Sequence, residues 1–534
     1  MHRPVWQRVL VALAALAVAL GTGLAPAWAA DAPAWPAVSN GQQNVSVLTA
    51  QHLLRQTGET ITADGIFGSN TLAAVKRFQT AHGLTADGVV DADTWPELVV
   101  PVDSGATGEA VQALQVQLNR YGYGLSVDGD FGTLTAKAVT AFKAFYDLGS
   151  GTSVDTTTWQ WLVGSTPAGE QVAPGVTYKS MQVSTSHGLA VGYVLTVDLT
   201  RAGVHVGLIS PGKVAQTATI TTQANRVGAV GGVNGDFFNI GETGAATGPE
   251  IGDGHELKAA VPGKQRYGPT RPAGTDNHHV FGITNSGAPT ITTLDLDGTA
   301  TTPDGSFDLT GLNQYAIPVD GVGVFNADWG ATSRKRATCG TESDRDAACS
   351  TQTKEVEIAD GKVTRVATAP GSGQIAAGAT VLLARDAGVS QLSGLAVGDP
   401  VTVDYHLVSG DGSTLQTAIG GLVLAMDGQR LSLDDSTSTL APRTAVGSNA
   451  DGSKLYMVAV DGRNGSSVGA TLKTMADIMA GLGATQDVIN FDGGGSTTLV
   501  ARKPGATTTS VRNSPSDGSQ RSVANGLGVF STAG

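Results

Sequence analysis

Apolar residues in the first third of the chain recur at a helical period. Leu72, Val75 and Phe78 are spaced three residues apart, which predicts a helix with one buried face. Residues 91–98 follow as a short helix, whose Trp95 we expect to close the core. Turn-forming polar residues separate these apolar segments. The pattern therefore predicts small three-helix units in this part of the chain.

From about residue 177 onward, the pattern changes to the two-residue alternation of strands. Strands are predicted at 193–199, 204–209, 230–234, 455–460 and 487–491. A helix is predicted at 471–482, and short strands over about 354–440 indicate a β insertion. The predicted fold class is multidomain, with two small all-α three-helix modules followed by a large α+β, strand-rich domain.

The helical part repeats itself with an offset of 64 residues. Asp64-Gly65-Ile66-Phe67-Gly68 recurs as Asp128-Gly129-Asp130-Phe131-Gly132. Other landmarks recur with the same offset, namely Thr71 and Thr135, Val75 and Val139, Phe78 and Phe142, Asp91 and Asp155, and Trp95 and Trp159. A single offset at so many landmarks indicates two copies of one module.

These landmarks resemble the peptidoglycan-binding domain that is common in bacterial wall hydrolases. The resemblance covers 41–99 and 102–163, and it implies modules that bind wall glycan and carry out no catalysis. Folding alone also explains the turn and core residues, so binding is assigned to each module as a whole. Residues 164–176 are rich in Pro, Gly and Thr, which predicts a flexible linker.

The N-terminus has the pattern of a signal peptide, predicted as 1–29. Arg3 and Arg8 flank the start of an apolar run at 9–20, and Ala27-Trp28-Ala29 offers small residues for cleavage. No later segment has the ~20 apolar residues of a membrane helix. We therefore expect a bacterial protein that is secreted, extracellular or wall-associated, with no membrane span after signal removal.

Composition supports an exported, turn-rich protein. Only 15% of the 534 residues are charged, and 72 are glycine. The 33 basic and 46 acidic residues give a net charge of −13, which argues against nucleic-acid binding. Cys339 and Cys349 are the two cysteines, and in an exported protein we expect them to form one disulfide.

Polar constellations follow predicted strands of the large domain at three places, namely Asn234 with Asp236 and Asn239, residues 492–496, and Arg521 with Asn525. Three successive glycines after Asp492 allow close backbone approach to a ligand, and their free amides would form an anion nest. Asp492 beside them is a candidate acid, base or nucleophile. Tight turns and Asx hydrogen bonds are the structural alternative for these residues.

One serine motif matches a catalytic pattern, but we interpret it as a helix cap. Residues 465–469 match the Gly-x-Ser-x-Gly pattern of a nucleophile elbow, between a predicted strand and a predicted helix. Residues 461–466 separate the strand from Ser467, the serine of the motif, whereas an elbow needs this serine on the turn itself. We therefore predict that Ser466 or Ser467 is the N-cap of the following helix.

Five segments appear in one order along the large domain, namely Asn-Gly-Asp-Phe-Phe (234–238), Arg-Thr-Ala-Val-Gly (443–447), Val-Asp-Gly-Arg (460–463), Phe-Asp-Gly-Gly-Gly-Ser-Thr (491–497) and Arg-Ser-Val-Ala-Asn-Gly-Leu-Gly-Val (521–529). Together they resemble the phosphodiester glycosidase family over 177–534. The animal member of that family removes N-acetylglucosamine from a sugar phosphodiester to uncover mannose 6-phosphate. The resemblance implies a related hydrolysis here.

Such a reaction needs a carboxylate that stabilises an oxocarbenium-like centre or activates water, and cations that hold the phosphodiester. The predicted catalytic residues are Asp492, Asp236 and Glu250. Predicted substrate-binding residues are Asn234, Arg443, Asp461, Arg463, Gly493, Gly494, Gly495, Ser496, Arg521 and Asn525. Guanidinium forks suit a phosphate. The sequence assigns no cofactor and leaves a divalent cation and its ligands open.

We therefore predict a secreted cell-wall glycosidase that hydrolyses a GlcNAc-1-phosphodiester-like bond in envelope glycopolymers. The repeats would bind peptidoglycan and raise the local substrate concentration. One alternative is a non-catalytic wall-binding or carbohydrate-recognition protein. Another is a glycoside hydrolase that acts on non-phosphorylated wall glycans. The sequence defines neither the sugar, the anomer nor the oligomeric state.

Overall fold

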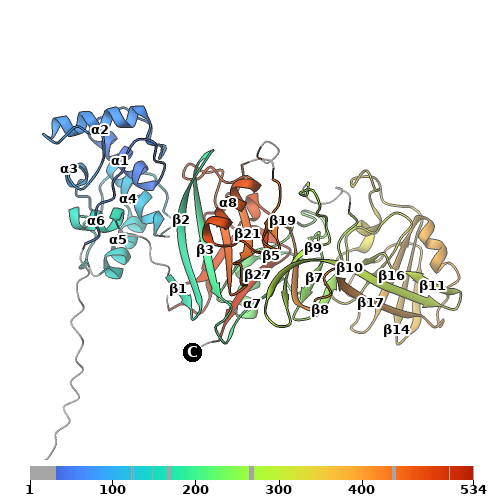
Figure 1. Cartoon of the computed structure of the whole chain (residues 1–534). Coiled ribbons are helices and arrows are strands. Elements are labelled where there is room, and N and C mark those ends of the chain that lie inside the picture. The colour runs from blue at the N-terminus through green and yellow to red at the C-terminus, as the bar shows by residue number, and fades with distance from the viewer. Residues whose placement is uncertain are drawn as a thin grey trace, which may run out of the picture.

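The computed structural model describes residues 32–532, apart from 122, 124, 147, 165–169, 264–269, 434, 436–439 and 504. The predicted signal peptide, 1–29, lies outside the described residues. A helical N-terminal part stands beside a larger part built of several sheets (Figure 1). This architecture confirms the predicted fold class. Among the described residues, no helix combines the length and apolarity needed to cross a bilayer.

Each repeat contributes three helices, which are α1 (Val45–Gln56), α2 (Ser69–Ala81) and α3 (Trp95–Leu98), then α4 (Glu109–Arg120), α5 (Thr133–Phe145) and α6 (Thr156–Gly164). Trp95 and Trp159 are fully buried, as expected. The helices of both repeats share one apolar core, because α1 packs against α4. At that contact, Gln117 Nε2 donates to Thr49 Oγ1 at 2.8 Å. The two repeats therefore form one unit.

A buried glutamine stabilises the Asp-Gly turn of each repeat. In the first copy, Gln51 Nε2 donates to Asp64 Oδ1 at 3.0 Å, and the amide of Gly65 donates to Gln51 Oε1 at 2.7 Å. In the second copy, Gln115 makes the equivalent bonds to Asp128 and Gly129 at 2.7 and 2.9 Å. Because the same bonds occur in both repeats, 64 residues apart, Asp64 and Asp128 are interpreted as residues that stabilise the turn.

The flexible linker predicted at 164–176 is wrong for its second half. Residues Glu170–Ala173 form strand β1, which pairs with the antiparallel strand β2 (Val176–Thr185). Gly175 takes the left-handed conformation, with φ of 76°, that lets the chain reverse between them. The Pro/Gly content thus marks a tight turn at this point.

Two sheets pack face to face around the main core of the large domain. The eight-stranded sheet runs β1, β2, β3 (Gly188–Asp198), β22 (Lys454–Val460), β21 (Arg443–Ser448), β23 (Val488–Asn490), β19 (Leu422–Met426) and β20 (Gln429–Arg430). The five-stranded sheet runs β25 (Thr509–Val511), β24 (Leu499–Arg502), β6 (Gly231–Asn234), β27 (Gly526–Ser531) and β4 (Val204–Ile209). Tyr178, Val233 and Phe491 are among the side chains between them.

One helix covers the outer face of each of these sheets. Helix α8 (Leu472–Leu482) packs its apolar face on the eight-stranded sheet, and α7 (Ile220–Val227) packs on the five-stranded one. The prediction that Ser466 or Ser467 caps α8 is wrong. Thr471 is the N-cap, since its hydroxyl accepts from the Thr474 amide at 3.0 Å.

Further strands form the side of the large domain that lies away from the repeats (Figure 1). One sheet contains β11 (Gly305–Asp308), β10 (Pro289–Thr302), β9 (His279–Thr284), β18 (Leu415–Gly420), β7 (Glu250–Gly252) and β8 (His255–Lys258), with β17 (Thr402–Ser409) paired to β10. Another contains β12 (Gly311–Leu312), β13 (Val322–Phe325), β16 (Thr380–Arg385), β14 (Thr353–Ala359) and β15 (Lys362–Ala367). A short pair joins β5 (Ala218–Thr219) to β26 (Ser522–Val523).

The predicted β insertion at 354–440 does not coincide with one structural unit. Its strands β14 to β17 lie in the outer sheets, whereas β19 and β20 belong to the eight-stranded sheet. Strand β10, which precedes the predicted segment, pairs with β17 within it. Pairing between distant strands determines which sheet each strand joins. The alternation of apolar and polar residues along the chain does not predict that pairing.

We expect Trp95→Ala to destabilise the repeat unit by about 3–5 kcal/mol, because it empties a fully buried indole site. It also removes the hydrogen bond from Nε1 to the Pro36 carbonyl, which measures 2.8 Å. Denaturant unfolding of the full chain measures this change. Leu134→Ala, at a side chain 70% exposed, is the control and should cost less than about 0.5 kcal/mol. Equal losses in both variants would contradict the assigned core.

Candidate active site

Strand ends from both central sheets meet at one edge of the sandwich. Arg443 begins β21 and lies opposite Val460, the last residue of β22. Asn234 ends β6 opposite Gly526, the first residue of β27. The backbone amide of Asp492, two residues after β23, donates to the Gly235 carbonyl at 2.9 Å. The segments that carry the predicted site residues therefore converge.

Asn234 links the two sheets through its fully buried side chain. Its Nδ2 donates to the Asp492 carbonyl at 2.7 Å. Its Oδ1 accepts from the Thr444 hydroxyl at 2.6 Å and from the Thr498 amide at 2.9 Å. Three of the four hydrogen-bonding sites of this amide thus go to the protein, which indicates that Asn234 positions the segments that build the site.

Asn525 connects the backbone of Asp236 with the carboxylate of Glu250, two predicted catalytic residues. Its Oδ1 accepts from the Asp236 amide at 2.9 Å, and its Nδ2 donates to Glu250 Oε1 at 2.7 Å. The Asp236 carboxylate accepts from the amides of Phe237 and Gly248. Burial raises the pKa of Asp236 and raises the pKa of Glu250, and both side chains are 4% exposed or less. They lie behind the surface as a supporting pair.

Two cations that the sequence analysis missed balance these carboxylates. Lys258 stands opposite Glu250 in the β7–β8 hairpin and is fully buried. Its ammonium donates to the carbonyls of Gly248 and Ala259, while burial lowers its pKa. Arg271 donates to Asn277 Oδ1 and the Gly421 carbonyl, and its charge offsets the rise in the pKa of Asp236. A single Lys in a four-residue strand has no sequence pattern that would mark it as a buried partner of a carboxylate.

Asp492 is the carboxylate that reaches the surface edge of this cluster. It is only partly buried, and Oδ1 accepts from the Gly493 amide at 2.9 Å. Burial raises the pKa of Asp492 to about 6, against the opposing effects of the Ser496 hydroxyl, the Gly493 amide and Arg521. The charge of Asp236 raises it further. A carboxyl with this pKa is largely ionised at neutral pH, which is the form that a general base or nucleophile needs.

Each of the three glycines after Asp492 faces one arginine. A Cβ at Gly493 would lie 3.7 Å from Arg443 Cδ, and one at Gly494 would lie 3.2 Å from Arg463 Nη1. A Cβ at Gly495 would lie 2.2 Å from Arg521 Nη2. The missing side chains at Gly494 and Gly495 thus leave room for the guanidinium groups of Arg463 and Arg521, and the Arg443 side chain lies alongside Gly493. We call Arg443, Arg463, Arg521 and Gly493–Gly495 the arginine cradle.

The charges in the arginine cradle are close to one another. Burial lowers the pKa of Arg443, and the neighbouring charge of Arg463 lowers it further. Arg463 is exposed and has φ of 59°, a left-handed conformation that turns its backbone sharply after Asp461. Arg521 pairs with Asp517 at 2.7 Å. Concentrated positive charge at a partly open edge suits an anionic ligand.

The predicted nest of free glycine amides is wrong for two of its members. The Gly493 amide donates to Asp492 Oδ1, and the Gly494 amide donates to the Pro442 carbonyl at 2.9 Å. The first bond holds the turn that follows Asp492, and the second joins the turn at Gly494–Ser496 to the residue before β21. The glycines therefore serve close packing, and the arginines supply the cationic groups.

Asp461 and Ser496 have structural partners. Asp461 is 2% exposed and accepts from Asn513 Nδ2 and the Ser514 amide, each at 3.1 Å. Burial raises the pKa of Asp461 to about 6. The Ser496 hydroxyl is fully buried and accepts from Arg521 Nη1 at 3.4 Å. Asp461 therefore braces the loop that carries Arg463, and Ser496 connects Asp492 with Arg521.

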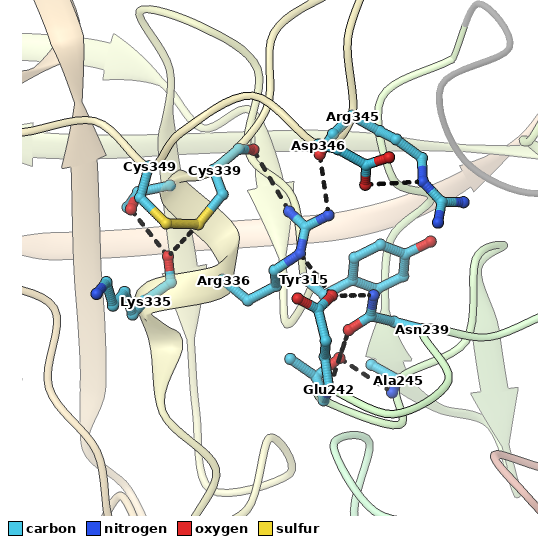
Figure 2. A network of polar contacts seen from close by, with 12 residues as sticks. Asn239, Glu242, Ala245, Tyr315, Lys335, Arg336, Cys339, Arg345, Asp346 and Cys349 are labelled. Atoms are coloured by element: carbon cyan, nitrogen blue, oxygen red, sulfur yellow. Dashed lines mark hydrogen bonds and ion pairs between the residues drawn. A yellow bond between two sulfur atoms is a disulfide. The ribbon is translucent and has the colours of Figure 1, made fainter.

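The predicted disulfide, Cys339–Cys349, is present and closes the loop that follows Arg336. Figure 2 shows Arg336 extending to Glu242, with which it forms an ion pair at 2.7 Å. Asn239 donates to the same carboxylate at 2.7 Å. Asn239 thus holds the loop after Asp236 and does not join the carboxylate cluster.

Metal coordination has no candidate in the described ranges. Among those residues, no group of three or more His, Cys, Asp or Glu side chains is arranged to hold an ion.

Two family models match the chain. The phosphodiester glycosidase model matches residues 352–530, and the peptidoglycan binding domain model matches 43–98 and 107–162. Both resemblances predicted from the sequence are thereby confirmed. The first match contains Asp492 and the arginine cradle, whereas Asp236 and Glu250 precede it. Together the matches support a glycosidase that acts at the cell wall.

Individual relatives are distant or short. An uncharacterized protein in the bpoA1 3' region of Kitasatospora aureofaciens is 50% identical over 44 residues, which are 8% of this chain and 37% of that protein. A hypothetical protein from Synechocystis has a TM-score of 0.53 at 21% identity, with 67% of this chain and 62% of that chain covered. A candidate exported protein from Burkholderia pseudomallei has a TM-score of 0.50 at 22% identity, covering 64% and 74%. These two structures share the fold.

We expect Gly495→Ala to lower kcat/KM at least tenfold with little change in global stability. The added Cβ would lie 2.1 Å from Asp517 Oδ2 and 2.2 Å from Arg521 Nη2, so this ion pair must move away from Asp492. Gly481→Ala is the matched control, because its Cβ meets no atom within 4 Å. Steady-state kinetics and thermal unfolding measure both variants. Full activity in Gly495→Ala would contradict the assigned cradle.

Proposed function

We propose that this protein is an exported cell-wall glycosidase that hydrolyses a sugar-1-phosphodiester, of the GlcNAc-1-phosphodiester type, in envelope glycopolymers. The observation that carries the proposal is the arginine cradle beside Asp492, a carboxyl whose pKa lies at about 6. A phosphodiester brings one fixed negative charge to three guanidinium groups. The family matches support the same reaction class and a wall glycan partner.

The chemistry follows from the leaving group. Water adds to the anomeric carbon and gives up a proton to Asp492 or to the departing phosphate, the bond from that carbon to the phosphate oxygen breaks, and the electron pair leaves with the phosphate. The departing group changes from a diester to a monoester and gains negative charge, so the arginines stabilise the transition state more than the ground state. A phosphate leaves readily, which reduces the need for a general acid.

Asp492 is the carboxylate best placed to assist the carbon centre. As an anion it either stabilises the oxocarbenium-like sugar or takes a proton from the attacking water. Asp236, Glu250 and Asn525 support it from behind, with Lys258 and Arg271 balancing their charge. In this proposal Asp492 is catalytic, while Asp236 and Glu250 are positioning residues.

Asp492 gives a pH-dependent prediction. Since the carboxylate is the active form and its pKa is about 6, kcat/KM should rise with pH through 6 and level off above about 7. Asp492→Asn should lower kcat/KM about a thousandfold and abolish this rise with pH. The assay is phosphomonoester release from a synthetic N-acetylglucosamine-1-phosphodiester.

Asp487→Asn is the matched control for that experiment. Burial also raises the pKa of Asp487 to about 6, but this residue precedes β23 at its other end and accepts from the Asp427 amide. The control should keep the parent pH profile. A profile that changes with Asp487→Asn and persists in Asp492→Asn would refute the assignment.

Arg463→Gln separates phosphodiester from ordinary glycoside hydrolysis. Loss of one guanidinium should lower kcat/KM for the phosphodiester at least tenfold, because a charged hydrogen bond contributes ~1.5–3 kcal/mol. Hydrolysis of a neutral aryl glycoside should not change. Arg430→Gln, at an exposed residue paired with Asp477, is the matched control. Equal losses on both substrates would favour a non-phosphorylated wall glycan, and wall binding without product from the parent would favour the non-catalytic alternative.

A further inference from the structure

A groove of about 800 Å³ lies between the repeat unit and the large domain. Asp64 and Ile66 of the first repeat and Gln112 and Ser126 of the second line one wall. The opposite wall comes from His187 and from residues 464–468 and 514 of the large domain. Its volume is within the range of known ligand sites. The two repeats and the large domain thus build one concave surface together.

The lining of the groove differs in charge from the arginine cradle. No lysine or arginine lines it in the described part of the chain, and Asp64 is its one carboxylate. The oxygen Oδ1 of Asp64 already accepts from Gln51 and from the Ile66 amide. What remains is a mixture of amide, hydroxyl and imidazole groups with small aliphatic side chains. This mixture suits an uncharged sugar strand, which has hydroxyl and amide groups and apolar ring faces.

Two loops of the large domain face both the groove and the arginine cradle. In the first, Arg463 points to Gly494 while the next residue, Asn464, lines the groove. In the second, Asn513 donates to the Thr497 carbonyl behind the cradle while Ser514 lines the groove. Asp461 ties the two loops together through Asn513 and Ser514. A bound strand in the groove would therefore end close to Arg463.

We propose that this groove binds the uncharged, N-acetylated sugar strand of the wall and presents its phosphodiester-linked end to the arginine cradle. Presentation to the cradle rests on the proposed function, whereas binding of the strand does not. The repeats and the large domain then act as two walls of one site. The groove selects the neutral part of the polymer, and the arginines select its phosphodiester.

The test uses the full mature chain and the N-acetylglucosamine tetramer as an uncharged probe, titrated by calorimetry. The parent should bind the tetramer. Ser126→Trp fills the groove and should weaken binding at least tenfold, and Gln112→Ala removes one amide and should weaken it about fivefold. Ser104→Trp, at an exposed serine of the same repeat outside the groove, is the matched control and should bind within twofold of the parent.

Turnover of a small N-acetylglucosamine-1-phosphodiester separates the two proposals. Ser126→Trp and Ser104→Trp should both stay within twofold of the parent on this substrate, with unchanged thermal unfolding midpoints. No tetramer binding by the parent, or binding by Ser126→Trp equal to that of the parent, would overturn the groove proposal. A parent that binds the tetramer and fails to turn over the phosphodiester would overturn the proposed function and leave the groove in place.

Discussion

The candidate site depends on the requirement that buried polar groups find partners. Asn234 meets this requirement for both central sheets at once, because its side chain bonds the Asp492 carbonyl, the Thr444 hydroxyl and the Thr498 amide. Losing such a side chain would leave each partner unsatisfied at a cost of ~1–3 kcal/mol. The position of the reactive carboxylate in one sheet is therefore fixed by a residue at the end of a strand in the other.

The same requirement explains the division between buried and accessible charges. Asp236, Glu250 and Lys258 have almost no solvent contact, and a single ion among them would be expensive. They persist as a set because hydrogen bonds supplement the opposite charges. Asn525 donates to Glu250, backbone amides donate to Asp236, and Lys258 donates to a backbone carbonyl. The set can shape the field around Asp492 without touching a ligand. The arginine cradle, at the partly open edge, carries the groups that a ligand can reach.

The sequence predicted what is local in period and spacing. The helices, the buried tryptophans, the main strands and the disulfide follow from patterns within short segments. The sequence also predicted that Asp492, Asp236 and the arginines share one site, because the motifs that carry them occur in the order typical of one family. Lys258 and Arg271 were missed because isolated cations give no signal until strand pairing places them beside carboxylates. The predicted nest of free amides was wrong because the Gly493 and Gly494 amides bond to other groups of the protein. The predicted flexible linker was partly wrong because amino-acid composition cannot distinguish a tight hairpin turn at Gly175 from a flexible connection.

Strand β1 has a mechanical consequence. Because Glu170–Ala173 is hydrogen-bonded into the large domain, only residues 165–169 separate it from α6, and five residues span at most ~18 Å when fully extended. This short connection keeps the large domain beside the repeats, so an enzyme bound to the wall through its repeats could work only on bonds that the adjoining large domain can reach. To reach other bonds along the wall, the repeats would have to dissociate and rebind. Very tight binding by the repeats would therefore slow hydrolysis of distant bonds.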